Sequence, residues 1–361
     1  MAVHSLALTN FRNLRGGTVR FGAGSNVLYG ANGSGKTNLL EAIFMVCLGR
    51  SQRGAADAVL LGRDADFFRL EGEIESGSNR HKLAVAYQRG FRKKLTIDTK
   101  PARAFELFEL NSLVAAGPED SEILSGPPSI RRLFLDLYIS QHSTTYLADL
   151  TDYQRALTQK NAALRGELDA TPFDPMLVEY GTKVILQRAG FLRSLGVRSV
   201  SAYARIAGGE QLVVEYQSNI PISLESMNVD SARAAFEAEL SRVADRERAV
   251  QTSLAGPHRD EVFFGIGGLP ARTHGSQGQW RTAAVALKLA VYDMLREKRG
   301  EPPVLLLDEI FAELDNDRTA RLVESFGDIG QLFLTTAVRP PDQLMARAER
   351  FRLVDGQVMK E

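Results

Sequence analysis

The sequence predicts an α/β fold in which a mixed sheet and an antiparallel β layer are interrupted by an inserted, mainly helical arm. A glycine-rich loop lies between a strand pattern and a helix pattern near the start, and leucines recur at three- and four-residue steps in the middle. Near the end are two runs in which apolar and polar residues do not alternate, at 304–307 and 331–336. Such runs are typical of buried parallel strands. We therefore expect a head made of 1–125 and 253–361, split by an arm at 126–252.

The glycine-rich loop fits the phosphate-loop pattern G-x-x-x-x-G-K-[ST] at every fixed position. In this motif, backbone N–H groups face a polyphosphate and the following helix N-terminus adds favourable partial charge. The pattern assigns Lys36 to the β- and γ-phosphates and the Thr37 hydroxyl to Mg²⁺. It therefore predicts a nucleoside triphosphate site. Its residues are Gly30, Ala31, Asn32, Gly33, Ser34, Gly35, Lys36 and Thr37, and Asn38 continues the helix.

Composition limits the class of protein. The 361 residues suffice for two or three domains. Lys+Arg and Asp+Glu both number 44, so a globally basic surface is excluded, although a local basic face is not. A single cysteine, Cys47, excludes an internal disulfide and a cysteine-cluster zinc site, and we expect it to be buried. Without an apolar run of membrane-spanning length or a signal-peptide pattern, we expect a cytoplasmic protein with no membrane partner.

The pattern of apolar residues places the remaining elements. We expect the middle region to hold two antiparallel helices joined by a loop at 171–175, a strand at 211–216 and a third helix whose N-cap is Asp230 or Ser231. Period-two alternation predicts strands at 3–8 and 18–21, and 25–29 is expected to be a short buried strand. Strand-like stretches at 67–75, 81–87 and 94–98 predict an antiparallel hairpin layer beside the nucleotide site.

An acidic pair follows the apolar run 304–307. At the carboxyl end of a buried strand beside the phosphate loop, Asp308 is placed to bind Mg²⁺ directly or through water. Glu309 is placed to polarise an attacking water, so Glu309 and Lys36 are the predicted catalytic residues.

A second anion-binding pattern precedes a helix expected at 281–298. Ser276 and Gly278 lie in the string Ser-Gln-Gly-Gln. Because the chain already has a phosphate site in its own loop, a second anion site is explained if it binds the nucleotide of another copy. The string resembles the Ser-Gly-Gly-Gln signature of ABC-type ATPases, with Gln277 in place of the first glycine. By that resemblance, 313–315 is the dimer-contacting D-loop and Thr336 fills the switch-histidine position. We place no Q-loop glutamine.

Several further stretches resemble the RecF family of bacterial DNA replication and repair proteins, which is related to Rad50 and SMC heads. The N-terminal and phosphate-loop text is shared with Rad50 and SMC, whereas the middle pieces favour RecF. The matching pieces cover essentially the whole chain. They are 6–14, 26–43, Arg131–Arg132 with 134–136, 159–164 and 256–260.

The resemblance implies an ABC-type ATPase head with a helical arm and no long coiled coil. It implies ATP-dependent homodimerisation on duplex or gapped DNA and weak, DNA-stimulated ATP hydrolysis. It further implies recombinational repair in the SOS response with the partners RecR and RecO, which load RecA at gaps coated by single-strand binding protein. By the family pattern, Arg12 contacts the nucleotide phosphates or the nearby loop, and Asn32 serves nucleotide or dimer contacts.

The DNA-binding surface is left open. Basic clusters occur at 89–94, at Arg131–Arg132 and along Arg242, Arg246 and Arg248. Such clusters are more often solvated faces or hairpin tips, and Arg131 and Arg132 are equally compatible with ion pairs to nearby acids. Apart from Phe91 in the first cluster, no aromatic residue interleaves with these charges, so we expect DNA binding to be largely independent of sequence.

The sequence disfavours three other functions. A transporter ATPase is disfavoured by the long insertion and the missing Q-loop glutamine. A GTPase switch is disfavoured because no Asn-Lys-x-Asp motif is present. A structural SMC-like protein needs long coiled-coil arms, for which 126–252 is too short.

Overall fold

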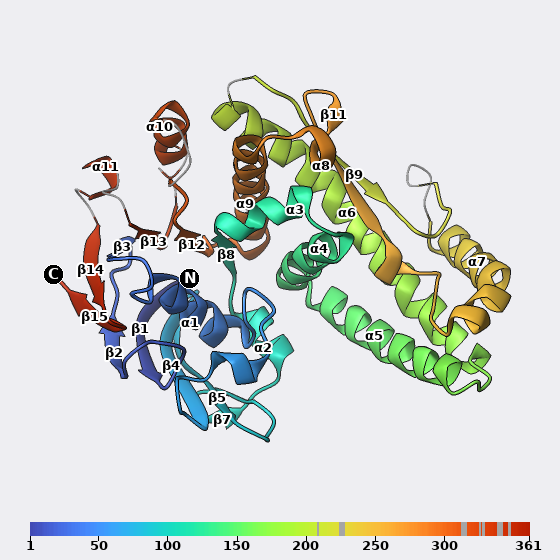
Figure 1. Ribbon diagram of the computed structural model, residues 1–361, viewed down its shortest axis with the longest axis horizontal. Coiled ribbons are helices and arrows are strands. Elements are labelled where there is room, and N and C mark those ends of the chain that lie inside the picture. The colour runs from blue at the N-terminus through green and yellow to red at the C-terminus, as the bar shows by residue number, and fades with distance from the viewer. Residues whose placement is uncertain are drawn as a thin grey trace. The chain divides into compact units, whose positions relative to one another are not determined.

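The computed structural model divides the chain into two compact units, which are described separately (Figure 1). The head unit contains 1–120, 205–207 and 284–361, and the arm unit contains 121–204 and 208–283. The residues that the structure describes are 1–207, 209–223, 228–311, 316–324, 326, 329–337, 342–345 and 348–361.

A six-stranded core sheet organises the head unit, in the order β15-β14-β3-β13-β12-β8. All neighbouring pairs are parallel except β14 with β15, and β12 and β13 are buried along their whole length, as the apolar runs predict. Asp308 pairs with Thr335 and Thr335 with Leu28, so the carboxyl ends of β12, β13 and β3 meet at one edge. The strands are β3 Ser25–Tyr29, β8 Leu113–Ala116, β12 Val304–Asp308, β13 Leu332–Thr336, β14 Glu349–Val354 and β15 Gln357–Lys360.

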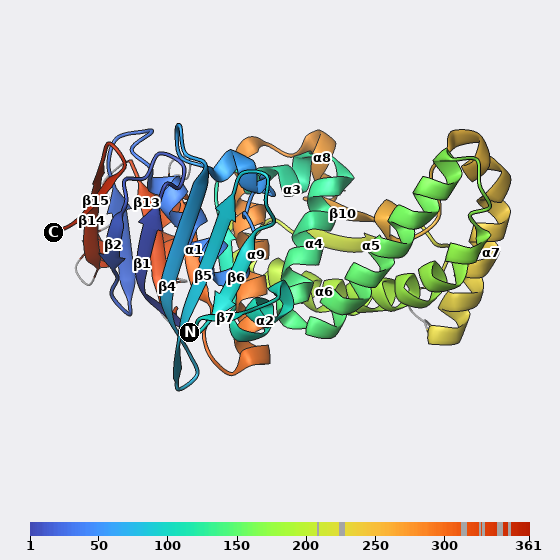
Figure 2. The same cartoon turned by 90° about the horizontal axis from the view of Figure 1, so that it is seen from below.

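The predicted antiparallel layer is the second sheet of the head, in the order β2-β1-β4-β5-β6-β7 (Figure 2). Helix α1, Lys36–Leu48, contacts strands of both sheets. Its residues 39–48 are all buried, because a helix covered on two sides has no solvent face. Cys47 is among them. The strands are β1 Ala2–Thr9, β2 Gly17–Arg20, β4 Phe67–Ser76, β5 Asn79–Gln88, β6 Lys94–Ile97 and β7 Lys100–Pro101.

Shorter helices complete the head unit. These are η1 Asp57–Leu60, α2 Ala104–Leu110, η2 Pro118–Ser121, α10 Asn316–Glu324 and α11 Asp342–Met345. Lys288, on α9 Gln277–Arg299, donates to the carbonyl of Ala115 at 2.8 Å and lies 2.8 Å from Asp120, so this helix is bonded to the end of β8.

The arm unit is mainly helical, as predicted. The third helix, α7, starts earlier than expected, because Asn228 and not Asp230 or Ser231 is its N-cap. The Asn228 side chain accepts from the Ser231 N–H at 2.8 Å. The elements are α3 Glu122–Ser125, α4 Pro128–His142, α5 Thr144–Arg165, η3 Thr171–Phe173, α6 Asp174–Ala207, β9 Leu212–Gln217, α7 Val229–Val250, η4 Pro257–Arg259, β10 Glu261–Ile266, β11 Leu269–Pro270 and α8 Ala271–His274.

The segment 253–283, which the sequence led us to assign to the head, clusters with the arm unit. The physical reason is long-range pairing: β10 pairs antiparallel with β9 along 261–266. The third sheet therefore has the order β11-β10-β9 and lies within the arm unit.

The stretch 256–260, one of those that resemble RecF, anchors this segment. Gly256 has φ 131°, and a Cβ there would lie 2.3 Å from the Tyr153 hydroxyl, so a side chain is excluded. Buried Asp260 accepts from Arg188 at 3.1 Å and from the Asn219 N–H at 2.8 Å. The stretch therefore fastens helices α5 and α6 to the strand that follows it.

His258 makes the stability of the arm sensitive to acid. Its Nδ1 lies 2.5 Å from the Tyr153 hydroxyl and its Nε2 lies 3.2 Å from the Ser253 carbonyl oxygen. Burial lowers the pKa of His258 from 6.5 to about 4. Below pH 6.5 the unfolded chain binds a proton that the folded arm excludes, so stability falls down to about pH 4. The total loss is about 3 kcal/mol.

We expect the stability difference between wild type and His258→Asn, measured by urea unfolding, to shrink as pH falls from 7.5 toward 4.5. Carboxylates titrate in both proteins, so the difference isolates the histidine. A difference that stays constant across this range contradicts the assignment.

Candidate nucleotide-binding site

The phosphate loop ends where α1 begins. Gly35 is the N-cap with φ 107°, a conformation that favours glycine. The first N–H groups of α1 have no earlier helical carbonyl, so they are available to an anion. The Ser34 hydroxyl oxygen is buried and has no hydrogen-bond partner among the described residues. The loop thus combines free donors with an unsatisfied buried hydroxyl, as a phosphate cradle requires.

Lys36 connects the loop to the acidic pair. Its ammonium donates to the carbonyls of Gly30 at 2.8 Å and Ala31 at 3.3 Å, and lies 3.1 Å from Glu309 Oε1. The side chain is only 5% exposed, so its charge is held at the loop. Glu309 has φ 48°, and its Oε2 accepts from the Ala337 N–H at 2.9 Å. The lysine and carboxylate with predicted catalytic roles therefore lie in direct contact.

Thr37 and Asp308 are brought together across the sheet edge. The Thr37 hydroxyl lies 3.0 Å from Oδ1 and 2.8 Å from Oδ2 of Asp308. The Thr335 hydroxyl donates to Asp308 Oδ1 at 2.5 Å and accepts from the Glu309 N–H at 3.0 Å, which fixes both acids. In the described part of the chain no cluster of three or more His, Cys, Asp or Glu could hold a metal. One carboxylate and one hydroxyl suit a hard cation that takes its remaining ligands from phosphate and water.

Several contacts at the loop were not predicted from the sequence. Asn13 Nδ2 donates to the Gly33 carbonyl at 2.8 Å, and Asn13 Oδ1 accepts from Asn38 at 2.7 Å. Arg53 lies 3.1 Å from Glu119 and 4.0 Å from Asp308. These partners lie far apart in the chain, and no local pattern marks them.

Arg12 and Asn32 have different environments. Arg12 pairs with buried Glu41 on α1 at 3.0 Å, and Ser51 donates to the same carboxylate at 2.6 Å. Asn32 is exposed within the loop. The nucleotide-contacting roles assigned to both by resemblance stay predictions.

Ser276 caps α9, which begins four residues before the expected start at 281. The Ser276 hydroxyl accepts from the Gln279 N–H at 3.2 Å, and Gln279 Oε1 accepts from the Ser276 N–H at 2.9 Å. Gln279 Nε2 also donates to Glu210 at 2.9 Å, and Glu210 accepts from Tyr203 at 2.7 Å. This reciprocal cap and its hydrogen-bonded support fix the orientation of the serine.

Gly278, Thr336 and the D-loop are the remaining parts of the ABC-type pattern. Gly278 lies in the first turn of α9, where its carbonyl accepts from Thr282 at 2.8 Å. Thr336 is the buried last residue of β13, and its neighbour Thr335 is the residue that reaches the acids. The predicted D-loop, 313–315, lies outside the described residues.

The basic clusters are largely internally paired. Arg131 is buried and forms a bidentate pair with Glu261 at 2.5 and 2.7 Å, and Arg132 donates to the Asp260 carbonyl at 2.8 Å. Lys93 pairs with Asp57 at 2.7 Å. Of the two alternatives for Arg131, the structure therefore supports an ion pair.

A cavity of about 1190 Å³ lies beside the phosphate loop, lined by the loop residues 30–34 and by β14 residues that include Arg350 and Arg352. Its lining does not include Lys36, Thr37 or Asp308, so we do not assign the triphosphate to it.

Comparison with known proteins agrees with this architecture. The family described as "RecF/RecN/SMC N terminal domain" matches residues 2–357. The DNA replication and repair protein RecF of Bacillus subtilis (strain 168) is 34% identical over 373 residues, covering 100% of both chains. A solved structure of the recombination mediator protein RecF-ATP in the RecFOR pathway is 30% identical, covers 99% of this chain and 97% of that chain, and gives a TM-score of 0.91.

A more distant structure shares the fold alone. The Smc head domain from Pyrococcus furiosus is 15% identical, with a TM-score of 0.56, and covers 99% of this chain and 96% of that chain. Within the described ranges, none of the helices has both the length and the apolar character of a membrane span. With a full-length relative at 34% identity and a matched fold, the chain belongs to the RecF family of ABC-type proteins related to SMC heads.

Proposed function

We propose that this protein is an ATP-dependent DNA-binding protein of recombinational repair, in which ATP closes a homodimer on duplex or gapped DNA. The observation that carries the proposal is the joint placement of Lys36, Thr37 and Asp308 at the edge of one buried sheet. The RecF relative bound to ATP supports ATP as the nucleotide.

In this proposal, Thr37 and Asp308 would hold Mg²⁺, which would neutralise charge at the phosphates. Lys36 binds the β- and γ-phosphates after exchanging its contact with Glu309 for phosphate oxygens. Glu309 then orients the attacking water. Thr335 positions both acids, because its hydroxyl bonds Asp308 and the Glu309 backbone at once.

Ser276 and Gly278 are proposed to bind the γ-phosphate of the ATP held by a second copy. The capped N-terminus of α9 supports this role, because its serine is exposed and orientated by Gln279. ATP bound between two copies favours the closed dimer by its differential affinity, and hydrolysis removes that preference. The proposal further includes slow ATP hydrolysis that DNA stimulates. It also includes action with RecR and RecO and a cytoplasmic location.

Sedimentation with Mg²⁺ tests this function. We expect a monomer without nucleotide and a dimer with a non-hydrolysable ATP analogue. Lys36→Arg, which keeps the charge but alters the loop contacts, is expected to shift the protein back to monomer at the same analogue concentration. A wild-type protein that remains monomeric under both conditions contradicts the proposal.

A further inference from the structure

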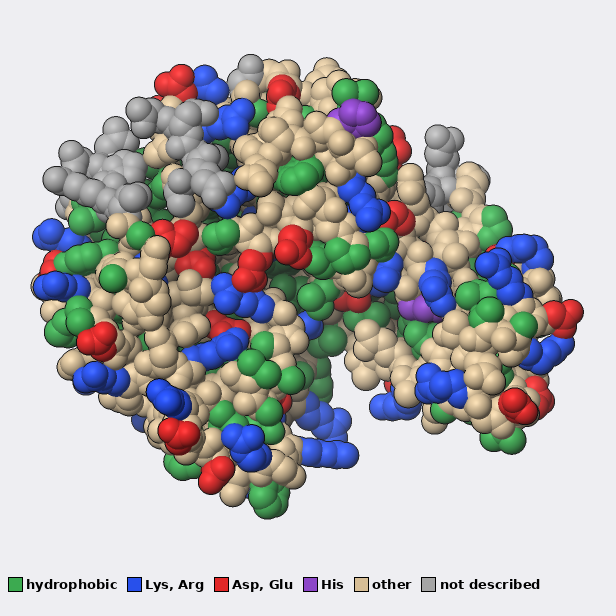
Figure 3. Space-filling model, in the orientation of Figure 1, with side chains coloured by type: hydrophobic (Ala, Val, Ile, Leu, Met, Phe, Trp, Pro, Cys, Tyr) green, Lys and Arg blue, Asp and Glu red, His purple; other side chains and the backbone are tan. Residues whose placement is uncertain are grey.

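A recess of about 320 Å³ on the arm unit gathers positive charge. Four residues of α7, one of them Glu239, line it together with Asn219, Leu254 and Arg259. In the space-filling view, Lys and Arg side chains gather over the part of the arm unit that contains α7 (Figure 3). The lining residues that matter here are Arg242, Arg246 and Arg259, with the apolar Val243 and Leu254.

The three guanidinium groups are not equivalent. Glu239 neutralises Arg242 through a bidentate pair at 2.7 and 2.6 Å. Arg246 is exposed, and none of the described residues pairs with it. Among the described residues, Arg259 donates only to a neutral acceptor, the Ser253 carbonyl, at 3.2 and 2.8 Å. Two uncompensated positive charges therefore line one recess.

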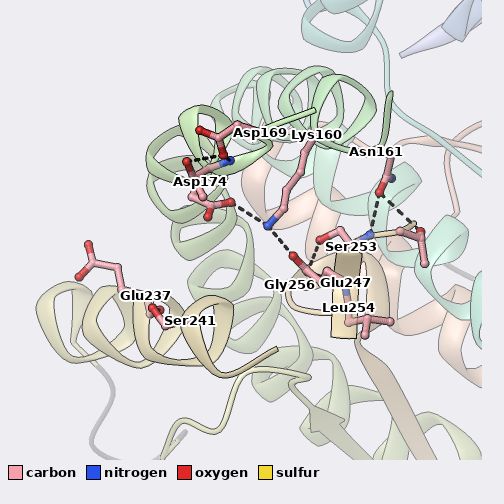
Figure 4. Close-up of polar contacts among 12 residues, drawn as sticks. Lys160, Asn161, Asp169, Asp174, Glu237, Ser241, Glu247, Ser253, Leu254 and Gly256 are labelled. Carbon is pink, nitrogen blue, oxygen red and sulfur yellow. Dashed lines mark hydrogen bonds and ion pairs between the residues drawn. The ribbon is translucent and has the colours of Figure 1, made fainter. Parts of the chain in front are cut away.

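The acceptor that holds Arg259 is itself fixed. Glu247 Oε1 accepts from the Ser253 hydroxyl at 3.0 Å and from the Leu254 N–H at 2.7 Å, and Asn161 accepts from the Ser253 N–H at 2.7 Å. Lys160 holds Glu247 at 2.7 Å, and its ammonium also lies 2.7 Å from Asp174 (Figure 4). Arg259 is thus ordered before any ligand binds, which lowers the entropic cost of binding.

We propose that this recess binds backbone phosphates of DNA through Arg246 and Arg259. A guanidinium group matches the geometry of phosphate oxygens, and its affinity is greatest where no carboxylate competes. None of the described residues that line the recess is aromatic, so the contact involves no base stacking there and is independent of sequence. The inference rests on the DNA binding in the proposed function and locates one contact surface for it.

A salt series tests the assignment. Duplex DNA affinity is measured by fluorescence anisotropy between 50 and 200 mM salt, a range of about fourfold, for wild type, Arg246→Gln, Arg259→Gln and the double variant. Each phosphate contact contributes about 0.9 to the slope of log affinity against log salt. We expect each single variant to lower the slope by about 0.9, and the double variant by about 1.8, because two contacts are lost.

Arg233→Gln is the matched control, because Arg233 is an exposed arginine on α7 that does not line the recess. The control is expected to keep the wild-type slope. Circular dichroism is used to check that Arg259→Gln is folded, and Arg246→Gln, at an exposed helical position, gives an independent readout. A double variant with the wild-type slope overturns the inference while leaving the proposed function intact.

Poly-glutamate distinguishes a protein partner from DNA. If the double variant lost poly-glutamate binding but kept its DNA slope, the recess would serve an acidic protein segment and the inference would be wrong. A wild-type protein that binds no DNA contradicts the proposed function itself, and the inference with it.

Discussion

Ser276→Arg is expected to abolish ATP-dependent dimerisation while leaving ATP binding by the monomer unchanged. The arginine adds bulk and positive charge at an exposed helix N-terminus, where the proposed function places the γ-phosphate of the other copy's nucleotide. The phosphate loop, with Lys36 and Thr37, belongs to the head unit and is untouched by the substitution. We expect no dimer at analogue concentrations that saturate the wild type, measured by sedimentation with a parallel nucleotide-binding titration.

Two controls separate this effect from loss of the helix cap. Ser276→Ala removes the hydroxyl that accepts from Gln279 and costs about 1 kcal/mol, without the added bulk. Its dimerisation is expected to weaken and not to vanish. Ser241→Arg makes the same substitution at an exposed site on α7 and is expected to dimerise normally. A Ser276→Arg protein that dimerises like the wild type would refute the role in trans.

Arg188→Met is expected to destabilise the arm unit by about 3–5 kcal/mol, because it leaves the buried carboxylate of Asp260 and the half-buried carboxylate of Asp136 without their cation. Arg188 is fully buried and lies 2.7 Å from Asp136 and 3.1 Å from Asp260. It also donates to the Pro257 carbonyl at 2.6 Å and to the Tyr146 hydroxyl at 2.9 Å. Burial already raises the pKa of Asp260, which shows how much its charge depends on this partner.

Trp280, the only tryptophan, reports on this unit in urea unfolding because it donates to the Ala271 carbonyl at 2.7 Å within the arm. Arg155→Met is the matched control: Arg155 forms an exposed pair with Asp152 at 3.2 Å, and its loss is expected to cost less than about 1 kcal/mol. Arg188→Met/Asp260→Asn is expected to recover part of the loss, because one unpaired charge is removed. Equal unfolding midpoints for Arg188→Met and Arg155→Met would show that the network contributes little.

Local patterns predicted the core strands β3, β12 and β13 but not β8, β14 and β15 of the same sheet. The loop pattern specifies where α1 begins, whereas the burial of residues 39–48 on every side follows from the packing of this helix between two sheets. The strand ending in Asp308 was predictable, because a run apolar on both faces requires cover on both faces. The spacing of apolar residues indicates which faces of an element are buried, so these elements can be predicted from neighbouring residues alone.

Boundaries and partners were less predictable. The start of α7 was misplaced because three of the four positions 228–231 carry good capping residues, and Asn228 is the one that forms the N-cap. The head–arm boundary near 253 rested on the return of strand patterns, whereas β10 joins the arm by pairing with β9. The residue pattern of one strand does not indicate which distant strand will pair with that strand.

The sequence by itself determined that this chain carries a phosphate loop, an acidic strand end and a signature string before a long helix, since each is a short motif with a local physical cause. Tertiary structure alone decided which side chains complete them. It brought the Thr335 hydroxyl into hydrogen-bond contact with Asp308 and Glu210 into contact with Gln279. It also bonded Arg259 to the neutral Ser253 carbonyl at the recess. Those contacts join residues that lie 27, 69 and 6 positions apart, and their geometry arises only when sheets and helices pack.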